Sequence, residues 1–339
     1  MGAVEVIEAL TKPLNKLIDS VSGAIGKVYE PKHKRKMADA TAYEIDRIGE
    51  ALRNNSDAII TYNNGQVVET SPEFEEFVQR TKQRFGYQEL LKQKNIEAVV
   101  DNAYEELEKV ESVSEEPVNQ DWMSRFFNCV EDIGDEDMQK LWGKVLAGEI
   151  KKPGSFSKRT LDVVKNLSSE EANAFDLIAT YVLSDNSSAF LPSEKKLLDK
   201  YKVSYGTILL LSESGLIVSN GLISEGLTVS ETMHSIVQYK GKALAVRRKG
   251  QGEVELSFGV YPLTQAGCEL YKIIRKEPKQ EYLFDFVETL LKDWEGRGIK
   301  ITLHDASLND DGKICWQEEV LKEWETAMAS PIILGNVVR

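Results

Sequence analysis

The sequence has few of the residues that disulfide frameworks and zinc sites require. Its 339 residues include three cysteines, Cys129, Cys268 and Cys315, which are widely spaced and form no CxxC pair. An odd number of isolated cysteines argues against a disulfide or zinc framework and predicts reduced thiols in a cytoplasmic protein. We therefore expect no structural metal.

Catalytic motifs are also missing. The three histidines, His33, His234 and His304, lie in different regions and form no HExxH pattern. The sequence contains no GxSxG, P-loop or dinucleotide-binding fingerprint. We predict a protein that is not an enzyme and binds no cofactor.

Long apolar runs are absent as well. The start, Met1 to Leu10, is acidic and lacks the apolar core of a secretory signal. No stretch approaches ~18 uninterrupted apolar residues, so no conventional transmembrane helix is expected. The net charge of -13 argues against a global attraction to nucleic acid or anionic lipid.

The first element that the sequence predicts is an amphipathic helix over residues 4–30. Its apolar residues recur at alternating steps of three and four, the rhythm of one helix face. We call these residues the N-terminal stripe: Ile7, Leu10, Leu14, Leu17, Ile18, Val21, Ile25 and Val28. The stripe predicts either a helix packed on its own domain or on another protomer, or a helix that enters a membrane when several copies gather.

A basic run follows the stripe at Lys32, Lys34, Arg35 and Lys36. Near an anionic leaflet each such residue contributes about 1 kcal/mol of attraction, so the run could hold the helix at the inner membrane. The alternative is a solvated linker. If the stripe is a membrane element, it must be covered at rest, by residues 37–111 or by a neighbouring protomer, because an exposed stripe would aggregate.

The middle of the chain reads as helices. Residues 33–54, 73–85 and 87–111 predict helices around a loop or hairpin at 55–72, and residues 121–185 predict a helical bundle. Asn119 or Asp121 can cap the first helix of that bundle, and Ser168 with Glu171 forms a capping-box pattern.

Residues 186–277 predict a winged-helix-like module, because two helices, a strand, a long hairpin and a third helix capped by Thr264 follow in order. Residues 235–247 and 253–261 are expected to pair. The hairpin carries the basic residues Lys240, Lys242, Arg247, Arg248 and Lys249. They could contact a nucleic acid or a protein partner, but the candidate recognition helix, residues 204–212, lacks Arg, Lys, Asn and Gln to read bases.

The tail is expected to be α/β, with a strand at 299–303 that pairs with 313–316 and a helix at 317–328. The predicted fold is therefore mainly α with a smaller α+β part. Its expected segments are 1–36 (amphipathic helix and basic run), 37–115 (helical domain), 116–185 (central helical bundle), 186–277 (winged-helix-like module) and 278–339 (α/β tail).

Two segments resemble known bacterial families. The stretch DWMSRFFNCVEDIGDEDMQKLWGKVLAGEIKKPGSFSKRTLDVVKNLSSEEANAF resembles an uncharacterised family often found in prophage and defence loci. The stretch LTKPLNKLIDSVSGAIGKVYEPKHKRKMADA, from residue 10, resembles the N-terminus of abortive-infection (Abi-alpha-like) proteins. The resemblance implies phage defence by disabling the infected cell.

Two hypotheses follow. In the first, a cytoplasmic protein senses a phage protein, forms a homo-oligomer and moves to the anionic inner membrane, which its N-terminal helices disrupt. In the second, the winged-helix-like module acts as a nucleic-acid-binding regulator. The acidic charge and the leucine-rich recognition helix make nucleic acid the less favoured partner.

Overall fold

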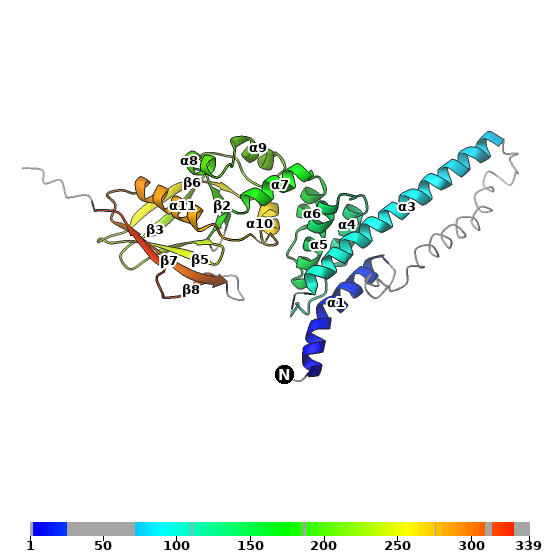
Figure 1. The fold of residues 1–339 in the computed structure, drawn as a ribbon, viewed down its shortest axis with the longest axis horizontal. Helices are drawn as coiled ribbons and strands as arrows, with labels where there is room; N and C mark the ends of the chain where they lie inside the picture. The colour runs from blue at the N-terminus through cyan, green and yellow to red at the C-terminus, as the bar shows by residue number, and fades with distance from the viewer. Residues whose placement is uncertain are drawn as a thin grey trace, which may run out of the picture. The chain divides into compact units, whose positions relative to one another are not determined.

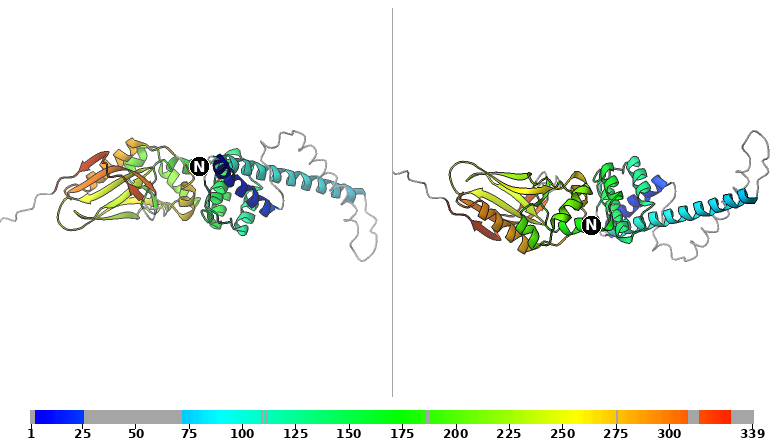
Figure 2. Two further views of the ribbon diagram at one scale, coloured as in Figure 1. Left: turned by 90° about the horizontal axis from the view of Figure 1, so that it is seen from below. Right: turned by 90° about the horizontal axis from the view of Figure 1, so that it is seen from above.

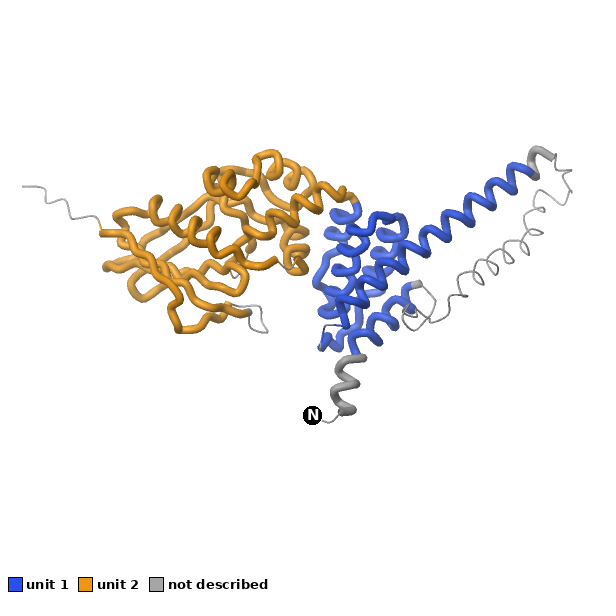
Figure 3. Tube along the Cα trace, in the orientation of Figure 1, with its two compact units in different colours: residues 1–165 blue, residues 166–339 orange. Residues whose placement is uncertain are grey.

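The computed structural model describes residues 3–25, 72–108, 110, 112–185, 188–274, 276–308 and 314–328. The chain divides into two compact units, residues 1–165 and 166–339 (Figure 3). The predicted helix at 33–54 and the hairpin at 55–72 lie outside the described residues, apart from Pro72.

The first unit is helical. Its described helices are α1 (Ala3–Ile25), α3 (Pro72–Leu107), α4 (Gln120–Val130), α5 (Glu136–Lys151) and α6 (Lys158–Lys165). The two helices predicted at 73–85 and 87–111 are one helix, α3, of 36 residues. Its C-terminal half packs on α5, whereas its N-terminal half extends beyond α4–α6 (Figure 1).

A glycine lets α3 and α5 approach closely. A Cβ atom at Gly143 would lie 2.5 Å from the Cβ atom of Asn102 and 3.0 Å from the amide nitrogen of Ala103. Beside this contact, Val99, Ala103 and Trp142 are fully buried. The contact therefore fixes the spacing of α3 and α5.

The second unit contains a sheet of nine strands within the described residues, and every strand pairing in it is antiparallel. The strand order is β3-β6-β2-β1-β4-β5-β7-β8, and β9 also pairs with β7. The strands are β1 (Leu183–Ser184), β2 (Ala189–Pro192), β3 (Ser224–Val229), β4 (Ser235–Tyr239), β5 (Lys242–Arg248), β6 (Val254–Pro262), β7 (Ile299–Leu308), β8 (Ile314–Trp316) and β9 (Lys322–Glu325).

Five helices of this unit accompany the sheet in the described chain: α7 (Ser169–Ile178), α8 (Lys195–Lys200), α9 (Tyr205–Glu213), α10 (Gln265–Tyr271) and α11 (Gln280–Asp293). Figure 2 shows α11 lying along one face of the curled sheet. It buries Tyr282, Phe286 and Leu290, which recur every four residues along one helix face. The ring of Phe286 meets that of Phe258 on β6, with centroids 5.4 Å apart.

The predicted fold class is therefore wrong. The strands at 186–277 do not form a small separate module with a tail beside it, because β5 pairs along its whole length with β7 of the tail. Residues 253–261, expected to pair with 235–247, lie in β6, which pairs with β2 and β3 instead. Residues 242–248 and 299–305 are far apart in sequence, and local periodicity carries no information about which distant strands pair.

One predicted element of the tail changes type. Residues 317–328 were expected to be a helix but contain the strand β9, which pairs with β7. Lys300 on β7 forms ion pairs with Glu323 and Glu325, which lie on the same side of β9. These cross-strand ion pairs and the backbone ladder favour the strand over the helix that the local sequence predicts.

The helix caps predicted from neighbouring residues are confirmed. Asn119 accepts a hydrogen bond from the amide of Trp122 at 3.0 Å, and Ser168 with Glu171 forms the predicted capping box. Thr264 accepts a hydrogen bond from the amide of Gly267 at 3.1 Å. The strand predicted at 299–303 lies within β7, but β8 pairs with Ala306–Leu308 of β7, beyond the predicted strand, and residues 300–303 pair with β9 instead.

Replacement of Gly143 by alanine should lower the free energy of unfolding by about 1–3 kcal/mol, because the new methyl group must push α3 away from α5. Chemical denaturation measures the change. Gly134→Ala is the matched control, since nothing lies within 4 Å of a Cβ atom there. A Gly143→Ala variant as stable as the control would contradict the close approach.

Candidate functional site

The helix α1 is docked in the helical unit, where it packs against α3, α4 and α5. Leu17 and Val21, one helical turn apart, are both 0% exposed. Burying two such side chains contributes roughly 3–5 kcal/mol by their apolar area alone. That burial is the main attraction that holds this part of α1 in place.

Polar contacts also join α1 to the segment between α3 and α4. The ammonium of Lys16 donates a hydrogen bond to the carbonyl oxygen of Ser114 at 2.8 Å, and Lys12 forms an ion pair with Glu115. The amide of Ser114 in turn donates to the carbonyl of Lys151 on α5 at 2.9 Å. Glu115 is 81% exposed, so its ion pair orients α1 more than it stabilises the docked state.

Lys16 lies in a partly dry environment. Burial lowers the pKa of Lys16, and the nearby carboxylates of Glu116 and Glu149 partly offset that effect. Glu149 is itself buried and accepts hydrogen bonds from the amides of Gly154 and Phe156 at 2.7 and 3.0 Å. The charged end of Lys16 is thus part of the docking contact.

The structure places the N-terminal stripe as follows. Leu17 and Val21 are buried, Leu14 and Ile18 are half-buried, and Ile7, Leu10 and Ile25 also lie within α1. Val28 and the basic residues Lys32, Lys34, Arg35 and Lys36 lie outside the described residues. The cover of the stripe comes partly from α3, inside the predicted range of 37–111, and partly from α4 and α5, outside it.

The structure does not gather the five basic residues of the expected hairpin. Lys240 occupies the turn before β5, and Lys242 forms an ion pair with Asp305. Arg247, Arg248 and Lys249 lie at the opposite end of β5, roughly 20 Å away at the usual rise per residue.

The far group of basic residues is partly engaged with its own unit. Lys249 forms an ion pair with Glu325, and the guanidinium of Arg248 donates to the carbonyl of Gln251 at 3.0 Å. The strand β5 lies between β4 and β7, so it forms no projecting wing. The five residues therefore make no continuous basic track for a nucleic acid backbone.

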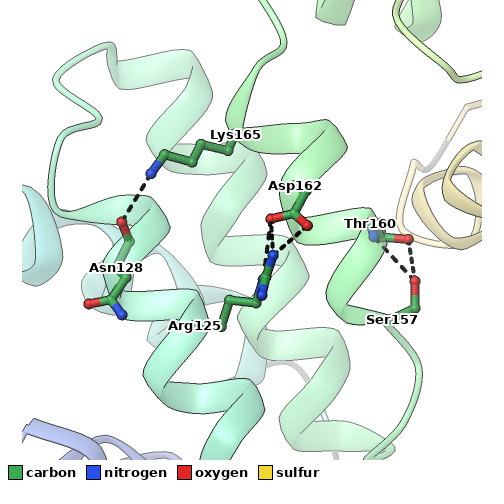
Figure 4. A network of polar contacts seen from close by, with 6 residues as sticks. All are labelled: Arg125, Asn128, Ser157, Thr160, Asp162 and Lys165. Carbon is green, nitrogen blue, oxygen red and sulfur yellow. Dashed lines mark hydrogen bonds and ion pairs between the residues drawn. The ribbon is translucent and has the colours of Figure 1, made fainter.

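A polar network holds α6 against α4 (Figure 4). Arg125 donates to both carboxylate oxygens of Asp162, from Nη2 at 2.7 and 2.5 Å and from Nε at 3.2 Å. Lys165 donates to the carbonyl oxygen of Asn128 at 3.4 Å. Both contacts pair groups of this unit, and we assign them a structural role.

The N-terminal half of α3 carries large apolar side chains that are exposed to solvent. The three most exposed are Phe77, Phe85 and Tyr87, at 57%, 57% and 64%. Leu90 and Leu91 on the same helix are also exposed, at 36% and 41%. Single exposed apolar residues are ordinary, but five within four turns of one helix are typical of an interaction surface. We expected residues 37–111 or a neighbouring protomer to cover the stripe, and the exposure of these five side chains shows that they do not cover it within one chain.

The described residues show neither a metal site nor a membrane-spanning helix. No group of three or more His, Cys, Asp or Glu side chains there is arranged to hold a metal ion. None of the helices described combines the length and the apolar content needed to span a bilayer.

The match to a known family starts inside α3 and ends inside α11. A family model described as a protein of unknown function, DUF2806, matches residues 79–287, more than half of the chain. The chain belongs to the DUF2806 family. No curated protein and no solved structure gives a match. Within this DUF2806 protein, α1 and the strands β7–β9 lie outside the matched segment.

Reversal of the charge on Lys12 should loosen α1. In Lys12→Glu, the carboxylate would repel Glu115, and the α1 amides should exchange hydrogen roughly two- to five-fold faster. Hydrogen exchange read by mass spectrometry checks this. The double variant Lys12→Glu, Glu115→Lys restores the attraction and should restore protection. Equal exchange rates in all three proteins would show that this ion pair does not help to dock α1.

Proposed function

We propose that this DUF2806 protein is an anti-phage abortive-infection protein that acts without catalysis. Its C-terminal unit binds a phage protein, copies of the chain cluster, and α1 leaves the helical unit to disrupt the inner membrane. The protein is cytoplasmic at rest in this proposal.

The observation that carries the proposal is the docking of α1. The apolar side chains Leu17 and Val21 are buried at rest, and the basic run of residues 32–36 follows in the sequence. When α1 buries these side chains in its own unit, it is harmless. When it buries the same side chains in a membrane, it is damaging. A ligand shifts such an equilibrium only if it binds the second state more tightly.

Clustering is required because the insertion of a single copy of α1 across a bilayer costs too much free energy. Lys12, Lys16 and Asp19 would each cost ~2.5–3.5 kcal/mol in the hydrocarbon core. A ring of copies can turn these residues toward a water-filled lumen. The exposed apolar residues of α3 supply a surface through which a second copy can associate.

A cross-link between α1 and its docking site should abolish vesicle binding. Lys12→Cys and Glu115→Cys, in a background of Cys268→Ser and Cys315→Ser, place two thiols where the native side chains form an ion pair. Treated with a short bis-maleimide, this protein should no longer float with phosphatidylglycerol-containing vesicles. The same protein treated with a monofunctional maleimide should float increasingly as its concentration rises.

Flotation by the cross-linked protein equal to that of the monofunctional control would refute release of α1. Vesicles of phosphatidylcholine alone are the second control, because they lack the charge that attracts residues 32–36. Leu17 and Val21 are avoided as test positions, since a carboxylate in their place would destabilise the helical unit itself.

Self-association should depend on the exposed surface of α3. Replacing Phe77 and Phe85 by serine should shift the protein toward monomer in sedimentation experiments, because it removes two of the three most exposed large apolar side chains on that helix. Gln88→Ser, an exposed polar position on the same helix, is the matched control. If the Phe77, Phe85 double variant associates as the wild type does, another surface joins the copies.

A further inference from the structure

Six side chains along α3 recur at alternating steps of three and four residues, and all six are exposed. We call them the α3 stripe: Phe77, Arg80, Arg84, Tyr87, Leu91 and Lys94. At 3.6 residues per turn this spacing stays on one side of a helix over about five turns, and two helices pack together through that repeat. The stripe therefore presents apolar and cationic side chains together on one side of α3.

The charges of α3 disfavour pairing with the same helix of a second copy. From Phe77 to Lys94 the helix carries one acidic residue, Glu89, and five basic ones: Arg80, Lys82, Arg84, Lys92 and Lys94. Two such segments side by side would bring cations together, and like charges that face each other across an interface cost free energy. A surface that combines apolar and acidic side chains suits the α3 stripe better.

Such a surface lies on the helix α9 of the second unit. The inner side of α9 is buried at Ile208 and Leu211. Successive turns of the helix carry three exposed residues, which we call the α9 face: Tyr205, Leu209 and Glu213. The two apolar members are 65% and 39% exposed. The α9 face therefore offers two apolar side chains followed by a carboxylate.

The segment that follows α9 is also exposed and apolar. It runs beside the last turn of the helix, because the amide of Leu216 donates to the carbonyl of Leu211 at 2.9 Å. Val218 and Leu222 of this segment are 38% and 92% exposed. From residue 203 to residue 226 the chain carries two carboxylates and no basic residue. The surroundings of the α9 face thus match the α3 stripe in apolar character and oppose it in charge.

We propose that the α3 stripe of one copy packs on the α9 face of a second copy. In an antiparallel arrangement, the carboxylate of Glu213 lies beside the guanidinium of Arg84, and this charged pair sets the register. The apolar side chains that follow on each helix then meet in order: Tyr87 with Leu209, and Leu91 with Tyr205. Each helix buries side chains that are exposed in the single chain.

The contact joins two different surfaces, so a pair of copies keeps one α3 stripe and one α9 face free. Such a head-to-tail contact repeats from copy to copy and produces a ring or an open chain. A ring is the arrangement that the proposed disruption of the membrane requires. The inference therefore rests on the clustering proposed above, and it supplies the second surface of that contact.

The test is sedimentation of two full-length variants, separately and mixed. The stripe variant carries Tyr87→Ser and Leu91→Ser, and the face variant carries Tyr205→Ser and Leu209→Ser. Each alone should associate at least ten-fold more weakly than the wild type, because it lacks one of the two surfaces. An equal mixture should form a one-to-one complex and nothing larger, because each variant supplies the surface that the other lacks.

Met233→Ser is the matched control for the face variant. Met233 lies in the turn between β3 and β4 and is 41% exposed, close to the value for Leu209. Because it lies at the opposite end of β3 from Leu222, its replacement should leave association unchanged.

A charge swap tests the register. Arg84→Glu and Glu213→Arg should each weaken association roughly two- to five-fold, because each puts like charges together. A chain that carries both changes restores the attraction between copies and should associate as the wild type does.

Association of the face variant equal to that of the wild type overturns the inference and shows that α3 uses another surface. Failure of the two variants to combine in the mixture also overturns it, as does a wild-type protein that stays monomeric at every concentration. None of these results bears on the release of α1, because flotation of the cross-linked protein measures that step separately.

Discussion

Leu17 and Val21 are buried inside the helical unit, and a helix can bury the same side chains in only one place at a time. The docked state of α1 therefore excludes every other partner for this face. Its stabilisation comes mostly from apolar area, while the contacts of Lys12 and Lys16 with the segment at 114–115 set its orientation. The contact between α3 and α5 at Gly143 does not involve α1, so the release of α1 that we propose leaves that contact in place.

The second unit depends on a different constraint. The ladder between β5 and β7 joins residues 242–248 to residues 299–305, and α11 lies between these strands in the sequence and along one face of the sheet (Figure 2). The strand β5 therefore has a hydrogen-bonded neighbour on both sides only after β7 has formed. The family match ends within α11, yet the matched strand β5 takes one of its neighbours from beyond that limit. The same ladder places Lys242 opposite Asp305, with which it forms an ion pair.

Sequence reasoning succeeded where the information is local. The caps at Asn119, Ser168 and Thr264 depend on contacts three residues away, and the spacing of Leu17 and Val21 correctly indicated a helix with one apolar face. It failed where distant segments decide the outcome. Residues 322–325 form a strand because β7 offers them a ladder, and the basic residues of β5 are separated and partly neutralised by tail residues such as Asp305 and Glu325. Lys240 was identified by its charge, but its place in the turn before β5 and its contact with the ring of Tyr271 required the fold.

The function we propose requires α1 to detach as a unit from a helical core that stays folded. Native-state hydrogen exchange in low, increasing concentrations of denaturant tests it most directly, because it separates local opening from global unfolding. If α1 detaches separately, the amides of residues 12–24 exchange through an opening of lower free energy than those of α5. If the amides of α1 and α5 exchange with the same free energy and the same denaturant dependence, α1 is an inseparable part of the core and cannot be released as we propose.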